Sequence, residues 1–135
     1  MNSSLNLTFN GDCAAAFRFY ERCLRGKVLF QLTWGDSPMA KDVPAEWGPK
    51  ICHSTLAAAG TTLHGVDTPS GAYEAPRGFS ILLDIEDPAE AQRLFGEFAA
   101  HGRVDLPLQE TFWARRYGKV VDRFGIPWEI NCPSA

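Results

Sequence analysis

An internal repeat constrains the fold of this chain more than any other feature of its 135 residues. In each half, an alternating apolar segment is followed by a segment with helical spacing and then by three strand-like segments. The apolar positions of the two predicted helices match at a constant offset of 75 residues, the pairs being Ala16 and Ala91, Phe19 and Leu94, Tyr20 and Phe95, and Cys23 and Phe98. We therefore predict an α+β protein made of two βαβββ modules.

The first module can be followed along the chain by its turn signals. The alternation of apolar and polar residues over 5–10 is typical of a strand with one face on the core. A turn signal at Gly11 opens a helix that ends at Gly26. Three further strands are predicted, over 27–33, 51–58 and 61–66.

The second module retraces this order. Alternation over 81–85 predicts a strand, and Asp87 followed by Pro88 is typical of a helix N-cap and first turn. The helix ends at Gly102, as the first helix ends at Gly26. The same supersecondary unit is thus predicted twice in succession.

The closing hairpins of the two modules match at a smaller offset than the helices. Residues 50–66 correspond to residues 115–131 at a fixed offset of 65, which pairs His64 with Glu129. Because the offset falls from 75 to 65, about ten residues must be extra in the first module. We place them between its second and third strands, within 34–49.

The segment 34–49 has the composition of a loop, with three prolines, two glycines and two tryptophans. Loops of more than about 12 residues in a compact domain are commonly functional. Two interpretations remain open. Trp34 and Trp47 belong either to a packed lid over a pocket or partner, or to a plug that covers the edge of the sheet.

Composition indicates a single globular domain over 1–135, with module 1 at about 1–70 and module 2 at about 71–135. Apolar residues make up 45% and charged residues 21%, which excludes wholesale disorder. The net charge of −3 and the lack of a basic run argue against nucleic acid and membrane surfaces as partners. No signal peptide or spanning segment is evident, so we expect a cytoplasmic protein.

The order of elements, with Phe9-Asn10-Gly11-Asp12-Cys13 before the first helix, resembles the vicinal oxygen chelate superfamily of glyoxalase I, bleomycin-resistance proteins and extradiol dioxygenases. More narrowly, residues 108–113 and 117–132 resemble its PhnB-like branch. The resemblance implies curved mixed sheets around a cupped pocket, and a homodimer.

The resemblance also implies four metal-ligand positions, which fall at Ser4 (or Leu5), His64, Ser80 and Glu129. His64 and Glu129 are suitable ligands for a divalent ion, whereas a neutral serine hydroxyl is a poor one. His53, on the adjacent predicted strand, is a further imidazole nearby. A divalent metal ion is therefore an optional cofactor here, with two of four ligands present.

Three roles are open for His64 and Glu129. They are metal ligands, or catalytic and orienting groups in a mostly apolar pocket, or structural groups with Glu129 paired to an arginine. We prefer the second role, in which they orient a ligand or move a proton.

Other side chains are candidates for the pocket wall. Polar and aromatic residues alternate poorly over 109–113, where the sixth strand and its exit are predicted, so a purely structural strand is disfavoured. Aromatic rings can cover a ring-bearing ligand, although aromatics at strand spacing are commonly core. The ligand-binding candidates are Trp34, His53, Gln109, Thr111, Phe112, Trp113, Tyr117 and Trp128.

We expect a PhnB-like protein that binds a small molecule in an aromatic-lined pocket, with enzymatic turnover left open. The alternative is a metal-dependent lyase or isomerase acting on a substrate with vicinal oxygens, in which Glu129 ligates the ion or acts as base. A third reading, in which the 34–47 loop mediates protein contacts, leaves the pocket without a role.

Overall fold

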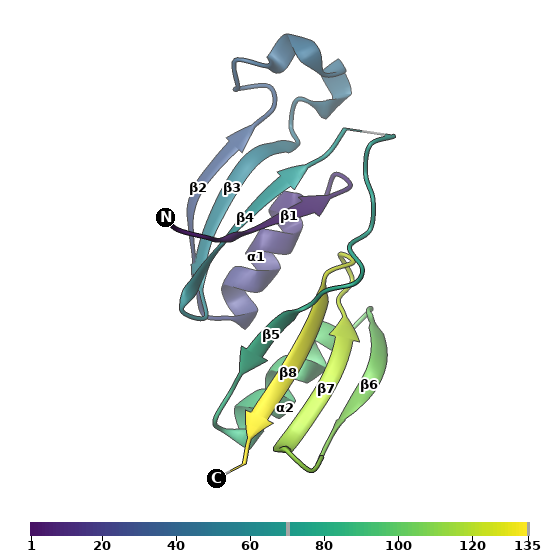
Figure 1. Ribbon diagram of the computed structural model, residues 1–135. Helices are drawn as coiled ribbons and strands as arrows, with labels where there is room; N and C mark the ends of the chain where they lie inside the picture. The colour runs from purple at the N-terminus through teal and green to yellow at the C-terminus, as the bar shows by residue number, and fades with distance from the viewer. Residues whose placement is uncertain (70, 135) are drawn as a thin grey trace. The chain divides into compact units, whose positions relative to one another are not determined.

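A computed structural model describes residues 1–69 and 71–134, and the chain divides into two compact units, Met1–Ala75 and Pro76–Ala135. Each unit contains one α-helix and one four-stranded mixed sheet, and the helix lies against one face of its own sheet (Figure 1). The α+β class and the repeated βαβββ order are therefore confirmed. Within 1–69 and 71–134, no helix is long and apolar enough to cross a membrane.

The first unit has strand order β1-β4-β3-β2, with β1 parallel to β4 and the other pairs antiparallel. Its core lies between the sheet and the helix, where the Phe9 and Phe17 rings meet edge to face at 6.0 Å. Gly65 allows this close packing, because a Cβ atom there would lie 2.7 Å from the Phe17 ring. The elements are β1 (Leu5–Phe9), α1 (Cys13–Cys23), β2 (Lys27–Thr33), β3 (Ile51–Ala58) and β4 (Thr61–Asp67).

The second unit has the equivalent order β5-β8-β7-β6. Asp87 caps its helix by accepting a hydrogen bond from the Ala89 backbone N–H, with Pro88 in the first turn, as the sequence predicts. The Phe98 ring of the helix stacks on Trp128 at 4.4 Å. The elements are β5 (Ile81–Asp84), α2 (Pro88–Ala99), β6 (Arg103–Gln109), β7 (Ala114–Val121) and β8 (Pro127–Pro133).

The strand registers correct one expectation about the repeat. In the first unit Thr55 pairs with His64, and in the second Lys119 pairs with Glu129. The fixed offset of 65 therefore holds for β4 and β8 but is wrong for β3 and β7, which correspond at an offset of 64. The physical reason is that the connection between equivalent positions of β7 and β8 is one residue longer than the connection between those of β3 and β4. A single offset for the whole hairpin therefore misaligns β3 and β7 by one residue.

The 34–50 connection carries two short 3₁₀ helices, Ala40–Asp42 and Ala45–Trp47. Trp34 is buried, and its indole Nε1–H donates to the backbone carbonyl of Asp67 at 3.0 Å. At the other end, Lys50 Nζ donates to the Gly11 carbonyl at 2.8 Å. For Trp34 this is the arrangement of a plug at the end of the sheet of the first unit.

Candidate functional site

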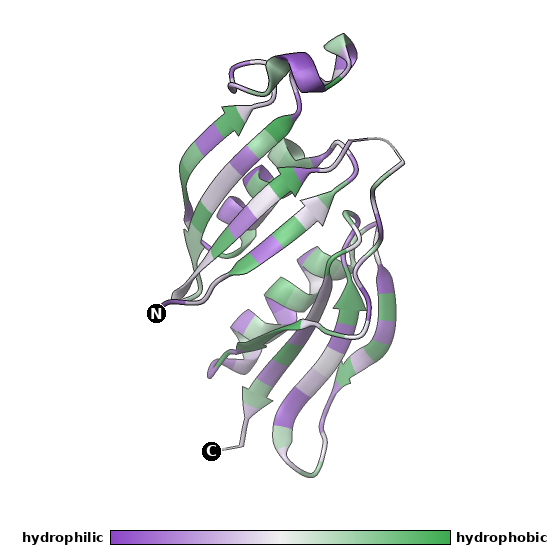
Figure 2. Cartoon of the chain, turned by 45° about the horizontal axis from the view of Figure 1, so that its top comes forward, coloured by the Kyte–Doolittle hydropathy of each residue, from purple (hydrophilic) through white to green (hydrophobic). Residues whose placement is uncertain are grey.

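In both units, the sheet face opposite the helix carries the polar side chains. Successive strand residues point to opposite faces, so burial should alternate along a strand that a helix covers on one side. In β3, for example, Ser54 and Leu56 are buried, whereas the neighbouring His53 and Thr55 are half-buried. Figure 2 shows the corresponding alternation of hydrophilic and hydrophobic residues along the strands. We call this surface the helix-free face.

On the helix-free face of the first unit, two histidines gather around a threonine. The hydroxyl oxygen of Thr55 lies 3.3 Å from His53 Nε2 and 3.2 Å from His64 Nδ1. The two imidazole rings stack, with centroids 5.2 Å apart, and Phe30 lies 6.0 Å from His53. A hydroxyl can donate one hydrogen bond and accept others, so Thr55 can bond one nitrogen of each ring at the same time.

On the helix-free face of the second unit, a carboxylate is held by two hydroxyl groups. Ser80 donates to Oε2 of Glu129, and Tyr117 donates to Oε1. The hydrogen bond from Ser80 is the largest cause that lowers the pKa of Glu129, followed by the hydrogen bond from Tyr117. The nearby Lys119 ammonium lowers this pKa further. Partial burial and the bond to Glu129 raise the pKa of Tyr117 to about 12. Glu129 is therefore ionised and Tyr117 protonated at neutral pH.

The two clusters occupy equivalent places in the repeat. With the corrected register, Thr55 corresponds to Lys119, and His64 corresponds to Glu129. Two residues earlier on each strand, His53 corresponds to Tyr117. The same three positions thus carry a neutral threonine between two imidazoles in one unit and a Lys-Glu-Tyr set in the other.

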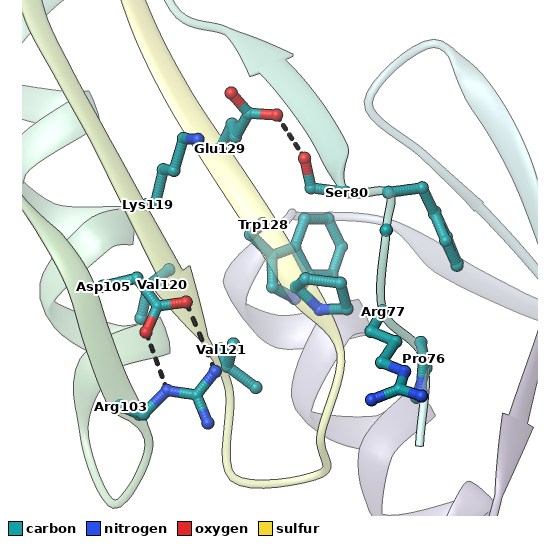
Figure 3. Close-up of a pocket in the computed structure, with 13 residues that line it drawn as sticks. Pro76, Arg77, Ser80, Arg103, Asp105, Lys119, Val120, Val121, Trp128 and Glu129 are labelled. Carbon is teal, nitrogen blue, oxygen red and sulfur yellow. Dashed lines mark hydrogen bonds and ion pairs between the residues drawn. The ribbon is translucent and has the colours of Figure 1, made fainter. Parts of the chain in front are cut away.

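The second unit contains a pocket of about 370 Å³ beside Glu129 (Figure 3). Its charged side chains come from the 76–80 segment and from β6, β7 and β8. Arg103 and Asp105 form an ion pair, with Nε 2.7 Å from Oδ1. The lining residues are Pro76, Arg77, Gly78, Phe79, Ser80, Arg103, Asp105, Lys119, Val120, Val121, Pro127, Trp128 and Glu129.

Of the candidates from the sequence, Ser80, Trp128 and Glu129 line this pocket. The Trp128 ring is buried, and its indole N–H donates to Asp122 at 2.8 Å. The other candidates lie outside the pocket lining. Thr111 Oγ1 accepts a hydrogen bond from the Ala114 backbone N–H and so shapes the turn before β7. Phe112 is 96% exposed, and Trp113 contacts Tyr117 edge to face at 5.1 Å. Gln109 ends β6, so the 110–113 segment forms the exit of this strand.

Four charged residues of the pocket were not among the candidates from the sequence, namely Arg77, Arg103, Asp105 and Lys119. Asp105 lies in an irregularity of β6, where the strand register shifts between Val104 and Leu106, and Arg103 comes two residues before it. Arg77 lies in the segment between the modules, which carries no periodic signal. Lys119 could have been found, because the correct register aligns it with Thr55 beside the His64 position.

The metal-ligand positions implied by the family resemblance do not make a suitable ligand set. Asn6 pairs with His64 and Leu82 with Glu129, which aligns Ser4, rather than Leu5, with Ser80. The Ser80 hydroxyl donates a hydrogen bond to Glu129, and both Glu129 oxygens already accept hydrogen bonds. Among the described residues, no three His, Cys, Asp or Glu side chains gather as a potential metal site. The donor chemistry therefore does not fit a tightly held divalent ion.

Comparison with known proteins assigns the family. The model of the Glyoxalase/Bleomycin resistance protein/Dioxygenase superfamily matches residues 7–130. The chain belongs to this superfamily. It is 34% identical over 133 residues to Protein YjdN of Escherichia coli (strain K12). The aligned region covers 93% of this chain and 90% of YjdN.

Solved structures of other proteins share the fold. Protein PA1353 from Pseudomonas aeruginosa is 39% identical, with a TM-score of 0.87 and coverage of 99% of this chain and 100% of that one. A PhnB protein from Bacillus cereus has a TM-score of 0.84 at 16% identity, with coverage of 98% and 99%. The superfamily fold predicted from the sequence is confirmed, and a PhnB protein is among the structural neighbours.

Proposed function

We propose that the chain binds a small organic molecule in the pocket of the second unit, with Glu129 as a fixed hydrogen-bond acceptor. The observation that carries this proposal is the position of Glu129 on the pocket wall, held by Ser80 and Tyr117. A volume of about 370 Å³ is within the range of pockets that take small ligands. A carboxylate fixed in this way needs little reorganisation when a ligand N–H or O–H group approaches it.

The state of Glu129 favours orientation of a ligand over proton transfer. A general base works best with a pKa near the operating pH, whereas the hydrogen bonds from Ser80 and Tyr117 lower the pKa of Glu129. A carboxylate whose negative charge is already stabilised has less affinity for a proton. We therefore propose that Glu129 orients the ligand and does not act as a general base.

The metal-dependent lyase or isomerase has less support. It requires an ion held by several protein ligands, and two of the four positions carry serine. His64 is hydrogen-bonded to Thr55, and Glu129 is hydrogen-bonded to Ser80 and Tyr117. A metal ion would have to replace these hydrogen bonds. Binding of a small molecule without a metal ion is therefore the simpler proposal.

A homodimer is the proposed assembly. Phe30 pairs with Thr55 and Leu82 pairs with Glu129, so both apolar side chains lie on helix-free faces. They are 50% and 53% exposed, which is high for large apolar groups beside polar clusters. A second copy of the chain would cover them, as the family resemblance implies.

Titration with a neutral, ring-bearing probe tests the binding proposal. Indole-3-acetamide offers an indole N–H donor to Glu129 and carries no charge. We expect Glu129→Gln to weaken its binding about tenfold, because a charged acceptor is replaced by a neutral amide. Glu97→Gln, which changes a carboxylate of α2 outside the pocket, should leave the affinity unchanged. Equal affinities of the wild type and Glu129→Gln, or no binding at millimolar concentration, would contradict the proposal.

A further inference from the structure

The 76–80 segment forms one wall of the pocket, and a glycine within it sets its backbone conformation. Pro76, Arg77, Gly78, Phe79 and Ser80 all line the pocket, just before β5 begins at Ile81. Gly78 has φ of +83°, a conformation that other residues adopt at a cost of about 1 kcal/mol or more. The chain therefore bends between Arg77 and Phe79 within the pocket wall.

The charged side chains of the pocket differ in whether they have a hydrogen-bond or ion-pair partner. Arg103 is paired with Asp105, and Glu129 accepts from Ser80 and Tyr117. Lys119 lies near enough to both carboxylates to lower the pKa of Asp105 and of Glu129. Arg77 makes no hydrogen bond or ion pair with any residue in 1–69 or 71–134. Among the described residues, the Arg77 guanidinium is thus open to a ligand, as is the Lys119 ammonium beside Glu129.

Arg77 and Glu129 lie at separate places in the pocket. Figure 3 shows Arg77 beside Pro76, away from the hydrogen bond between Ser80 and Glu129. Phe79 follows Arg77 by two residues, and 48% of its surface is exposed. A guanidinium presents planar N–H donors that match a carboxylate, and an exposed ring offers an apolar surface for a flat molecule.

From these contacts we propose that the pocket selects a ring-bearing carboxylate, with Arg77 as the residue that sets this preference. The proposal rests on the binding function proposed above and names the chemical class of its ligand. The carboxylate pairs with Arg77, the ring packs on Phe79, and an N–H or O–H group at the other end of the ligand donates to Glu129. Glu129 disfavours a second negative charge at its own end, so the ligand has a fixed direction.

Three indole probes that differ in charge test the preference. Indole-3-acetate is an anion, indole-3-acetamide is neutral and tryptamine is a cation, while all three share the ring and its N–H donor. We expect indole-3-acetate to bind wild-type protein about tenfold more tightly than indole-3-acetamide, in line with a charge-assisted hydrogen bond. Arg77→Gln should remove this difference, whereas Arg18→Gln, an equal charge change on the exposed side of α1, should preserve it.

The outcomes separate the two proposals. If indole-3-acetamide or tryptamine binds as tightly as indole-3-acetate and the binding depends on Glu129, the carboxylate preference is wrong and the binding function stands. If the preference survives in Arg77→Gln, the role of Arg77 is wrong. Failure of all three probes to bind would remove the binding function and this inference with it.

Discussion

At the residue scale, the ionisation of Glu129 is the feature that most directly determines what the pocket can do. Its two oxygens accept hydrogen bonds from Ser80 and Tyr117, which favour the charged form. The pKa of Glu129 in the folded protein therefore lies below the ordinary glutamate value of about 4.3. A group whose pKa is lowered by folding stabilises the fold above its unfolded pKa, and this contribution is lost as pH falls through the folded pKa.

We accordingly predict that Tyr117→Phe raises the pKa of Glu129 toward its ordinary value, because one of the two hydrogen bonds to the charged form is removed. Carbon-13 NMR titration of the Glu129 carboxyl measures this directly. Ser80→Ala should act in the same direction. A Glu129 pKa that is equal in wild type and in both variants would show that the hydroxyl groups do not hold the carboxylate.

The same linkage predicts how stability depends on pH. The loss of unfolding free energy caused by Glu129→Gln should be larger at about pH 7 than at about pH 3, because the stabilising contribution of the lowered pKa shrinks once the pH falls below the unfolded value of about 4.3. Chemical denaturation of both proteins at the two pH values gives the comparison. An equal difference at both values, or a larger one in acid, would contradict the assignment.

The pairing of His64 with Glu129 could be predicted from the sequence, because the repeat aligned their strands correctly. The roles of their neighbours could not. Ser80 was placed by family resemblance among the metal ligands, and in the structure its hydroxyl holds Glu129 instead. Lys119 escaped notice because a single extra residue in the β7–β8 turn shifted the alignment by one, and a shift of one residue reverses the face of a strand.

At the element scale, the bend at Gly78 decides how Arg77 and Phe79 are presented. A Cβ atom at Gly78 would meet nothing within 4 Å, so Gly78→Ala acts through the backbone alone. We predict that it weakens binding of indole-3-acetate, because alanine disfavours the positive φ that forms the bend.

Gly71→Ala is a matched control, since Gly71 also has a positive φ and open space around it but lies outside the pocket. Calorimetric titration of the two variants should show a loss for Gly78→Ala only. Equal losses in both would show that the effect comes from general backbone destabilisation.

A second prediction at this scale concerns how β4 fixes the ends of other elements. The buried carboxylate of Asp67 accepts from the backbone N–H groups of Gly11, Cys13 and Ile51 at 2.8–3.0 Å. Asp67→Asn places an NH₂ donor opposite these donors, and we expect a loss of about 1–3 kcal/mol in unfolding free energy. Asp36→Asn, at an exposed position, should change the unfolding free energy by less than about 0.5 kcal/mol in urea denaturation.

The helices and most strands were predictable because their periodicity and caps are local signals. The N-cap at Asp87 and the apolar stripe of α2 appear in the structure as the sequence indicates. The pocket wall at 76–80 was not predictable, because it depends on a φ angle and on an irregular segment. The plug formed by Trp34 likewise depends on contact with Asp67, 33 residues away.

At the scale of the whole molecule, each unit has its own core and leaves apolar side chains on its helix-free face. We predict a dimer by size-exclusion chromatography with light scattering, and we expect Phe30→Asp to weaken it by placing a charge in the covered face. Met39→Asp, at a residue 48% exposed on the 34–50 connection, should leave the assembly unchanged. A wild-type monomer at micromolar concentration would contradict the dimer.

The central claim is that the second unit holds a ligand beside Glu129, and chemical-shift mapping with indole-3-acetate tests it most directly. The account predicts that the largest amide shifts fall on the pocket residues of the second unit, including Lys119 and Glu129. Largest shifts around His53 and His64 in the first unit, or no shifts at millimolar probe, would contradict it.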